Sequence, residues 1–182
     1  MRLTSYAAML LLPASMLFAE DAPDYAKLLK GAKLTLADAM AQSLKEVKDG
    51  VVVAAEIEEE KGSVNASMDV ATGKTLHEVG IDIKTGKVVE NNAEKEDQSD
   101  LVAAAKITLT QAIESALKKV PGSAVAAKLE LSKEKPVAEV IVFADGKLTA
   151  VDIDGVSGKE TGTHDPKDDP KEGDEGKEGD GK

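Results

Sequence analysis

The chain has 182 residues, a formal net charge of −11, no cysteine and only 2% aromatic residues. Its single arginine is Arg2. Recognition of phosphates and base edges relies on arginine, and the nucleic-acid backbone repels an acidic chain, so the composition excludes nucleic acid as a partner. Without cysteine, an exported form of the chain must be held together by packing alone.

Residues 1–19 have the layout of a secretory signal peptide. Arg2 supplies the positive end, an apolar stretch runs over 6–12, and the small residue Ala19 precedes Glu20. The apolar run is shorter than the roughly 20 residues of a membrane-spanning helix, and a buried N-terminal helix is the alternative. We therefore expect a periplasmic or secreted protein that has no membrane span after cleavage of a Sec-type signal peptide.

The sequence also contains an internal repeat. Residues 28–47 return at 101–120 with a constant offset of 73 and nine identities in twenty positions. Self-similarity at a fixed spacing indicates one supersecondary unit that occurs twice.

Each copy begins with a predicted helix. Thr35 and Thr108 are the expected N-caps, because an acceptor side chain follows each of them three residues later, as in a capping box. Glycine with aspartate or proline ends the helices at 49–50 and 121–122. The apolar residues at helical spacing predict a core face; they are Leu36, Ala39, Met40, Leu44 and Val47, and then Leu109, Ala112, Ile113, Leu117 and Val120. We expect Leu44 and Leu117 to be buried at equivalent positions.

Alternating apolar and polar residues follow each helix, and turns such as Thr72-Gly73 and Asp145-Gly146 interrupt them. Strands with one apolar and one charged face are typical of an antiparallel sheet that is solvated on one side. The predicted fold class is α+β, with two pseudo-symmetric repeats, each one helix packed on a small antiparallel sheet of three or more strands. Units of about 60–70 residues are only marginally stable alone, so we expect the two to pack together.

The composition suggests where the units begin and end. We expect a signal peptide at 1–19, a first repeat at 20–92, a polar linker at 93–100, a second repeat at 101–162 and an acidic tail at 163–182. The tail has no aliphatic or aromatic side chain. Such a segment cannot bury enough surface to become ordered.

The turns and apolar positions together resemble the PepSY domain, a module of peptidase propeptides and of exported bacterial proteins. The resemblance rests on Pro121-Gly122, the turn at Asp145-Gly146 and the endings Ile81–Val88 and Val151–Lys159. It covers roughly 28–90 and 101–160, and implies a non-catalytic α+β module that binds or restrains peptidases. Leu76 and Leu148 stand where the family often has tyrosine or tryptophan, which argues against an aromatic-lined binding surface.

No residue is assigned a catalytic, cofactor-binding or metal-binding role. Of the two histidines, His77 is interpreted as a half-exposed strand residue, and His164 is placed in the disordered tail. The acidic run 56–60 alternates on a strand and is interpreted as a solvated face. The aspartates 145, 152 and 154 do not fit a calcium loop, since Ala150 would stand at its first ligand position.

The leading hypothesis is an exported, non-catalytic protein-binding module with a tandem PepSY architecture. Its expected partner is an exported or envelope protein, such as a secreted peptidase that it restrains; no cofactor is expected, and the oligomeric state is left open. The alternative is an acidic envelope protein that associates with cations such as calcium through the tail and the run 56–60.

The exported protein is expected to begin near Glu20, because the charge, the apolar stretch and the small residue occur in the order that signal peptidase requires. N-terminal sequencing of protein recovered from the envelope or the medium checks this. Recovery of the exported protein with 1–19 intact would contradict it.

Overall fold

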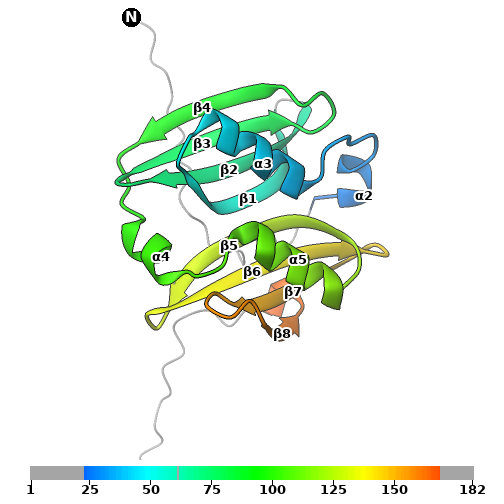
Figure 1. The fold of residues 1–182 in the computed structure, drawn as a ribbon. Helices are drawn as coiled ribbons and strands as arrows, with labels where there is room; N and C mark the ends of the chain where they lie inside the picture. Colours follow the sequence, from blue (N-terminus) through cyan, green and yellow to red (C-terminus); the bar gives the residue numbers. More distant parts are fainter. Residues whose placement is uncertain (1–22, 61, 169–182) are drawn as a thin grey trace, which may run out of the picture.

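The computed structural model describes residues 23–60 and 62–168, and these form a single antiparallel sheet covered on one face by helices (Figure 1). The order of the strands is β4-β3-β2-β1-β5-β6-β7-β8. The strands are β1 (Val51–Glu60), β2 (Ser63–Thr72), β3 (Thr75–Asp82), β4 (Val88–Glu94), β5 (Ser123–Ser132), β6 (Lys135–Ala144), β7 (Lys147–Asp154) and β8 (Glu160–His164). The first copy thus supplies one half of the sheet and the second copy the other half.

The helices follow the same repetition. Helix α3 (Leu36–Glu46) packs on the strands of the first copy, and α5 (Leu109–Lys119) packs on those of the second (Figure 1). A short helix precedes each of them, namely α2 (Tyr25–Leu28) and α4 (Ser99–Ala104). A 3₁₀ turn, η1 (Pro166–Asp168), follows β8. The α+β class with two repeats is confirmed, and each repeat has four strands.

Both long helices begin at the predicted capping boxes. Thr35 Oγ1 accepts a hydrogen bond from the amide of Asp38 at 3.1 Å, and Asp38 Oδ2 accepts one from the amide of Thr35 at 3.0 Å. Thr108 and Gln111 make the same reciprocal pair at 3.2 and 2.8 Å. Two amides that the first helical turn cannot satisfy are thereby bonded in each copy.

The same turn joins the last two strands of each copy. Asp82 Oδ1 accepts hydrogen bonds from the amide and hydroxyl of Thr85, and Asp154 Oδ1 accepts them from Ser157 in the same way. These bonds hold the pKa of both aspartates below its usual value. The repeat therefore includes these turns as well as residues 28–47 and 101–120, where the identical residues were found.

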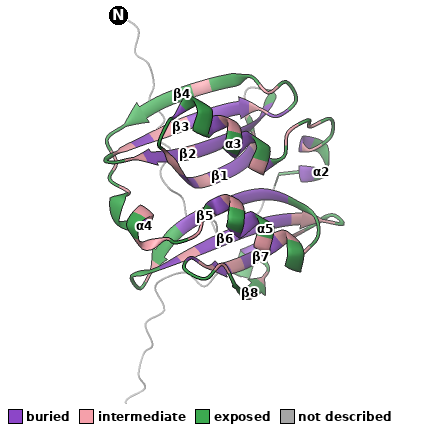
Figure 2. Ribbon diagram, in the orientation of Figure 1, coloured by how far each residue is buried: buried purple, intermediate pink, exposed green. Residues whose placement is uncertain are grey.

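The core lies between the sheet and the two long helices, where the strands are mostly buried (Figure 2). Valine, isoleucine, leucine, methionine and alanine fill it, as the scarcity of aromatic residues required. Two aromatic rings contact each other across the repeats. Tyr25 of α2 lies 6.1 Å from Phe143 of β6 between ring centroids, with the ring planes at 43°.

The halves of the sheet join through β1 and β5. Three residue pairs form this seam: Ala54 with Lys128, Ala55 with Ala127, and Glu56 with Ala126. A β-bulge precedes the seam in each copy, at Val53 and Val125, and both bulged side chains are buried. Bulges bend a strand and increase its twist, so the two copies meet with the same local curvature.

Several expectations about boundaries need correction. The expected linker 93–100 contains the end of β4 and the beginning of α4. His164 is not part of a disordered tail, because it is the last residue of β8, which pairs with β7. Residues 1–19 and 169–182 lie outside the described residues, so the signal peptide and the rest of the tail stay predictions.

Leu44 was expected to be buried, but it is 38% exposed, and Leu117 is only half-buried. The buried stripe of α3 passes instead through Leu36, Met40 and Ser43. Position 44 is one residue, or about 100°, away from Ser43 on the helix. The hydroxyl of Ser43 is accommodated there because it donates to the carbonyl of Met40 at 2.9 Å.

Truncation of the equivalent core residues Met40 and Ile113 to alanine is expected to lower the free energy of unfolding by about 2–5 kcal/mol each. Both side chains are at most 2% exposed and face the sheet. Leu44→Ala is the matched control, with an expected loss of under about 1 kcal/mol because its side chain is exposed. Urea unfolding followed by circular dichroism measures all three; a larger loss for Leu44 would contradict the helix orientation.

Candidate functional site

The face of the sheet that points away from the helices is acidic in the first copy. Glu56 and Glu58 alternate with the core residues of β1, Asp69 pairs with Ala54, and Glu78 pairs with Asp69. Directly paired residues share a face of a sheet. These four carboxylates, which we call the acidic face, therefore occupy neighbouring positions on three adjacent strands.

The acidic face is partly removed from water, and its charges repel one another. Burial raises the pKa of Glu56 to about 7, with Glu58, Asp69 and Glu78 as further causes. Burial likewise raises the pKa of Asp69 to about 7, with repulsion from Glu78, Glu96 and Glu94. The pKa values of Glu58 and Glu78 are also raised, first by burial and then by neighbouring carboxylates. A cationic ligand on this face would oppose both effects, because an opposite charge favours the ionised carboxylates.

The acidic face continues to an open edge of the sheet, strand β4. Among the described residues this strand pairs with β3 alone, and it carries Glu90 and Glu94 opposite Gly80 and Leu76. A Cβ atom at Gly80 would lie 3.1 Å from the Cβ of Glu90, so glycine there allows β4 to lie close. An edge strand presents unpaired backbone groups that can bind an extended segment of another chain.

Two exposed apolar side chains, Val88 and Val89, lie at the beginning of β4, with exposed fractions of 37% and 53%. The β4 edge therefore combines backbone hydrogen-bonding groups, apolar contacts and nearby negative charge. This combination suits an extended, basic polypeptide segment. The second edge of the sheet is the shorter strand β8.

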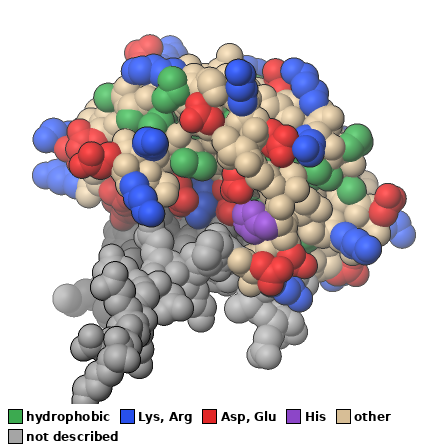
Figure 3. Space-filling model, turned by 90° about the horizontal axis from the view of Figure 1, so that it is seen from below, with side chains coloured by type: hydrophobic (Ala, Val, Ile, Leu, Met, Phe, Trp, Pro, Cys, Tyr) green, Lys and Arg blue, Asp and Glu red, His purple; other side chains and the backbone are tan. Residues whose placement is uncertain are grey.

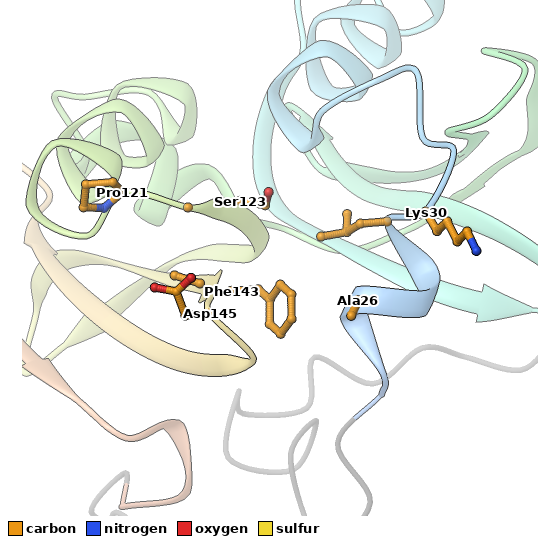
Figure 4. A pocket seen from close by; sticks show the side chains of 9 residues that line it. Ala26, Lys30, Pro121, Ser123, Phe143 and Asp145 are labelled. Atoms are coloured by element: carbon orange, nitrogen blue, oxygen red, sulfur yellow. The ribbon is translucent and has the colours of Figure 1, made fainter.

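A pocket of about 490 Å³ lies between the two copies (Figure 4). Helix α2 lines one side with Ala26 and Lys30, and the beginning of β5 and the end of β6 line the other with Ser123, Phe143 and Asp145. No histidine is among the residues that line this pocket. In α2, burial is the main cause that raises the pKa of Tyr25 to about 12, followed by Glu56 and Glu58.

The candidate residues considered from the sequence lie on different elements and do not form one site. His77 lies in β3, with Nε2 2.9 Å from the hydroxyl of Thr72, as expected for a half-buried strand residue. The carboxylates of the run 56–60 do not meet at one place, because Glu59 points to the other side of β1 and pairs with Lys27 at 3.4 Å. Asp154 accepts hydrogen bonds within its turn.

Sequence reasoning missed one cluster, formed by Glu139, Asp152 and His164 on β6, β7 and β8. The signal that could have found it is the alternation of β6 and β7, which places both carboxylates on the same face. In Figure 3, a view from below, a histidine side chain lies next to acidic side chains.

The comparisons with known proteins agree with the two-fold repetition. A family model described as "Peptidase propeptide and YPEB domain", PepSY, matches residues 33–92 and again residues 106–164. The chain belongs to the PepSY family. Each match begins just before a capping box and ends in the last strand of its copy, so one PepSY domain corresponds to one helix with four strands.

A solved structure of a presumed lipoprotein from Clostridium difficile 630 is similar to this tandem PepSY protein. The match covers 75% of this chain and 96% of that one, at 21% identity and a TM-score of 0.46. No protein of curated function matches the sequence. Within 23–60 and 62–168, no helix has the length and apolar character needed to cross a membrane.

The acidic face predicts that the PepSY protein is more stable at pH 5 than at pH 8. For Glu56 and Asp69 the folded pKa of about 7 exceeds the ordinary 4.5 and 3.8. The folded state therefore binds more protons between those values, and stability falls as the pH rises through this window. At about 1.4 kcal/mol per pKa unit, the loss is on the order of a few kcal/mol.

Urea unfolding between pH 5 and 8 measures this dependence. Asp82 and Asp154, whose pKa values are lowered, lose their contribution only below about pH 4 and do not affect the window. Glu56→Gln is expected to flatten the profile and to stabilise the protein at pH 8, whereas Glu114→Gln on the exposed side of α5 leaves it unchanged. Stability that increases toward pH 8 would contradict the prediction.

Proposed function

We propose that the chain is an exported, non-catalytic PepSY protein that binds another exported protein and restrains a secreted peptidase. The observation that carries the proposal is the acidic face of the first copy, which continues into the open edge β4. The partner segment that fits it is extended and basic.

Energetics support this assignment of the surface. Half-buried carboxylates that repel one another reduce the stability of the free protein. A basic partner segment would lower their pKa values again, so the repulsion in the free protein favours binding. Complementary charge also increases the rate of association.

The family supports the type of partner, since its description names peptidase propeptides. Export is supported by the charge and apolar pattern of residues 1–19 in the sequence. The absence of an enzymatic role is supported by the family's description as a peptidase propeptide domain.

The test measures hydrolysis of a peptide substrate by secreted peptidases of the same organism, with and without the protein at micromolar concentration. We expect slower hydrolysis while the PepSY protein remains intact. Val89→Lys is expected to weaken the effect at least tenfold, because a lysine on an edge strand opposes strand addition and repels a basic segment.

Val156→Lys is the matched control for the binding test. Val156 is also 53% exposed but lies in the turn between β7 and β8. Equal losses for both variants would contradict binding at β4. If no secreted peptidase is slowed or bound, the proposal of peptidase restraint is wrong.

A further inference from the structure

We propose that Glu139, Asp152 and His164 form a binding site for a divalent transition-metal ion, with zinc as the probe. The three residues come from β6, β7 and β8, which are consecutive strands of the sheet. Glu139 pairs directly with Asp152, and His164 pairs with Ala150. The strands thus present one imidazole and two carboxylates from the same face of the sheet.

The distances suit a shared ion better than direct hydrogen bonds. One ligand atom from each residue lies within 4.8 Å of the other two. Nε2 of His164 is 3.6 Å from Glu139 Oε2, and Nδ1 is 3.5 Å from Asp152 Oδ2. Good hydrogen bonds have lengths of about 2.7–3.2 Å. Ligands at about 2.0–2.1 Å around a tetrahedral ion are roughly 3.3 Å apart. Glu139 already lies near this distance from Nε2, and the carboxylate of Asp152, which lies beside Nδ1, would have to turn toward an ion bound at Nε2.

The burial of the His164 imidazole favours the binding of a ligand to it. Nε2 of His164 is inaccessible to solvent and has no hydrogen-bond partner, although the side chain as a whole is 24% exposed. A buried polar atom without a hydrogen bond is costly. A metal ion on this nitrogen would remove the cost, and the adjacent Glu139, which is only 6% exposed, supplies charge in a largely dry environment.

The charges around the cluster permit the binding of a cation. Lys128 of β5 is the positive group next to the cluster, with Nζ 4.0 Å from Glu139 Oε1. The same Nζ is 2.8 Å from Glu130, so it is held mainly by another carboxylate. With a neutral imidazole, the three ligands carry two negative charges, which matches a divalent ion.

The scaffold itself does not require these side chains. The equivalent positions of the first copy, 72 residues earlier, are Ser67, Gly80 and Asn92, which occupy the same register on β2, β3 and β4. That half of the sheet forms without an imidazole or a carboxylate there. The second copy therefore carries a ligand set that its fold does not need.

A bound ion would also stabilise β8, the outermost strand of the second copy. Strand β8 is the edge of the second copy, with β7 as its partner strand. An ion held by Glu139 of β6 and His164 of β8 would connect strands that are not neighbours. One imidazole with two carboxylates is a ligand set that zinc accepts, with a further position open to water.

Zinc titration of the purified protein at pH 7.5, by calorimetry and thermal unfolding, tests the site. We expect one equivalent to bind with a Kd of micromolar or lower and to raise the Tm. His164→Asn and Asp152→Asn are expected to weaken binding at least tenfold. His77→Asn is the matched control and should bind as the parent does, because His77 lies in β3 of the other copy, with Nε2 beside the hydroxyl of Thr72.

NMR of the histidine rings gives a readout that does not depend on a variant folding correctly. Zinc should change the ring signals of His164 and leave those of His77 in place. Cobalt should produce the absorption of a tetrahedral site with nitrogen and oxygen ligands.

Weak binding of several zinc ions with unchanged His164 signals would assign the metal to the acidic face and overturn the proposal. So would equal zinc affinity in the parent and His164→Asn. Neither result bears on peptidase restraint, whose test uses β4 and Val89.

Discussion

The pairing of β1 with β5 is the contact on which the rest of the structure depends. Without this pairing, each copy would have a second open edge, formed by a strand ten residues long. The seam joins these two edges, so that β4 and β8 lie at the ends of the sheet. It uses alanines on both faces, with Ala55 opposite Ala127 and Ala126 opposite Glu56. Small side chains there let α3 and α5 contact the strands of the other copy as well as their own.

The seam also explains how the protein tolerates the acidic face. Four carboxylates with raised pKa values oppose folding of the first copy. The buried apolar residues of both copies form a single cluster, so the second copy contributes to the stability of the first. Contact between Tyr25 and Phe143 adds a second connection beside the seam. Stability that is shared in this way permits one half to keep a surface that is costly by itself.

Much of the fold was predictable because its causes are local. A capping threonine, a helical stripe and a strand with one apolar face can each be recognised within about ten residues. The seam was not predictable, because alanines at 54–55 and 126–127 carry no signal of mutual pairing. His164 was misplaced because the sequence Glu160–His164 contains no apolar residue; β8 is ordered by its pairing with β7 rather than by burial of its own side chains. Burial of Leu44 was predicted wrongly because a serine that satisfies its own hydroxyl can replace an apolar residue in a stripe. The run 56–60 was interpreted as a solvated face, which is wrong for Glu56, because neighbours from other strands bury this side chain.

The two copies keep the same scaffold and differ in what they display on the same face. Capping boxes and the aspartate turns are maintained in both, since each satisfies backbone groups that any sequence in this fold must satisfy. The bulges are maintained as well, and they bend the two strands that meet at the seam. The open face has no such requirement, so Ser67 and Gly80 in one copy correspond to Glu139 and Asp152 in the other. Because the seam makes the sheet continuous, a ligand that binds the folded form at either end stabilises the whole domain pair by mass action. A ligand bound at one end of the sheet therefore also raises the free energy of unfolding of the other end, even if the two surfaces never contact the same ligand.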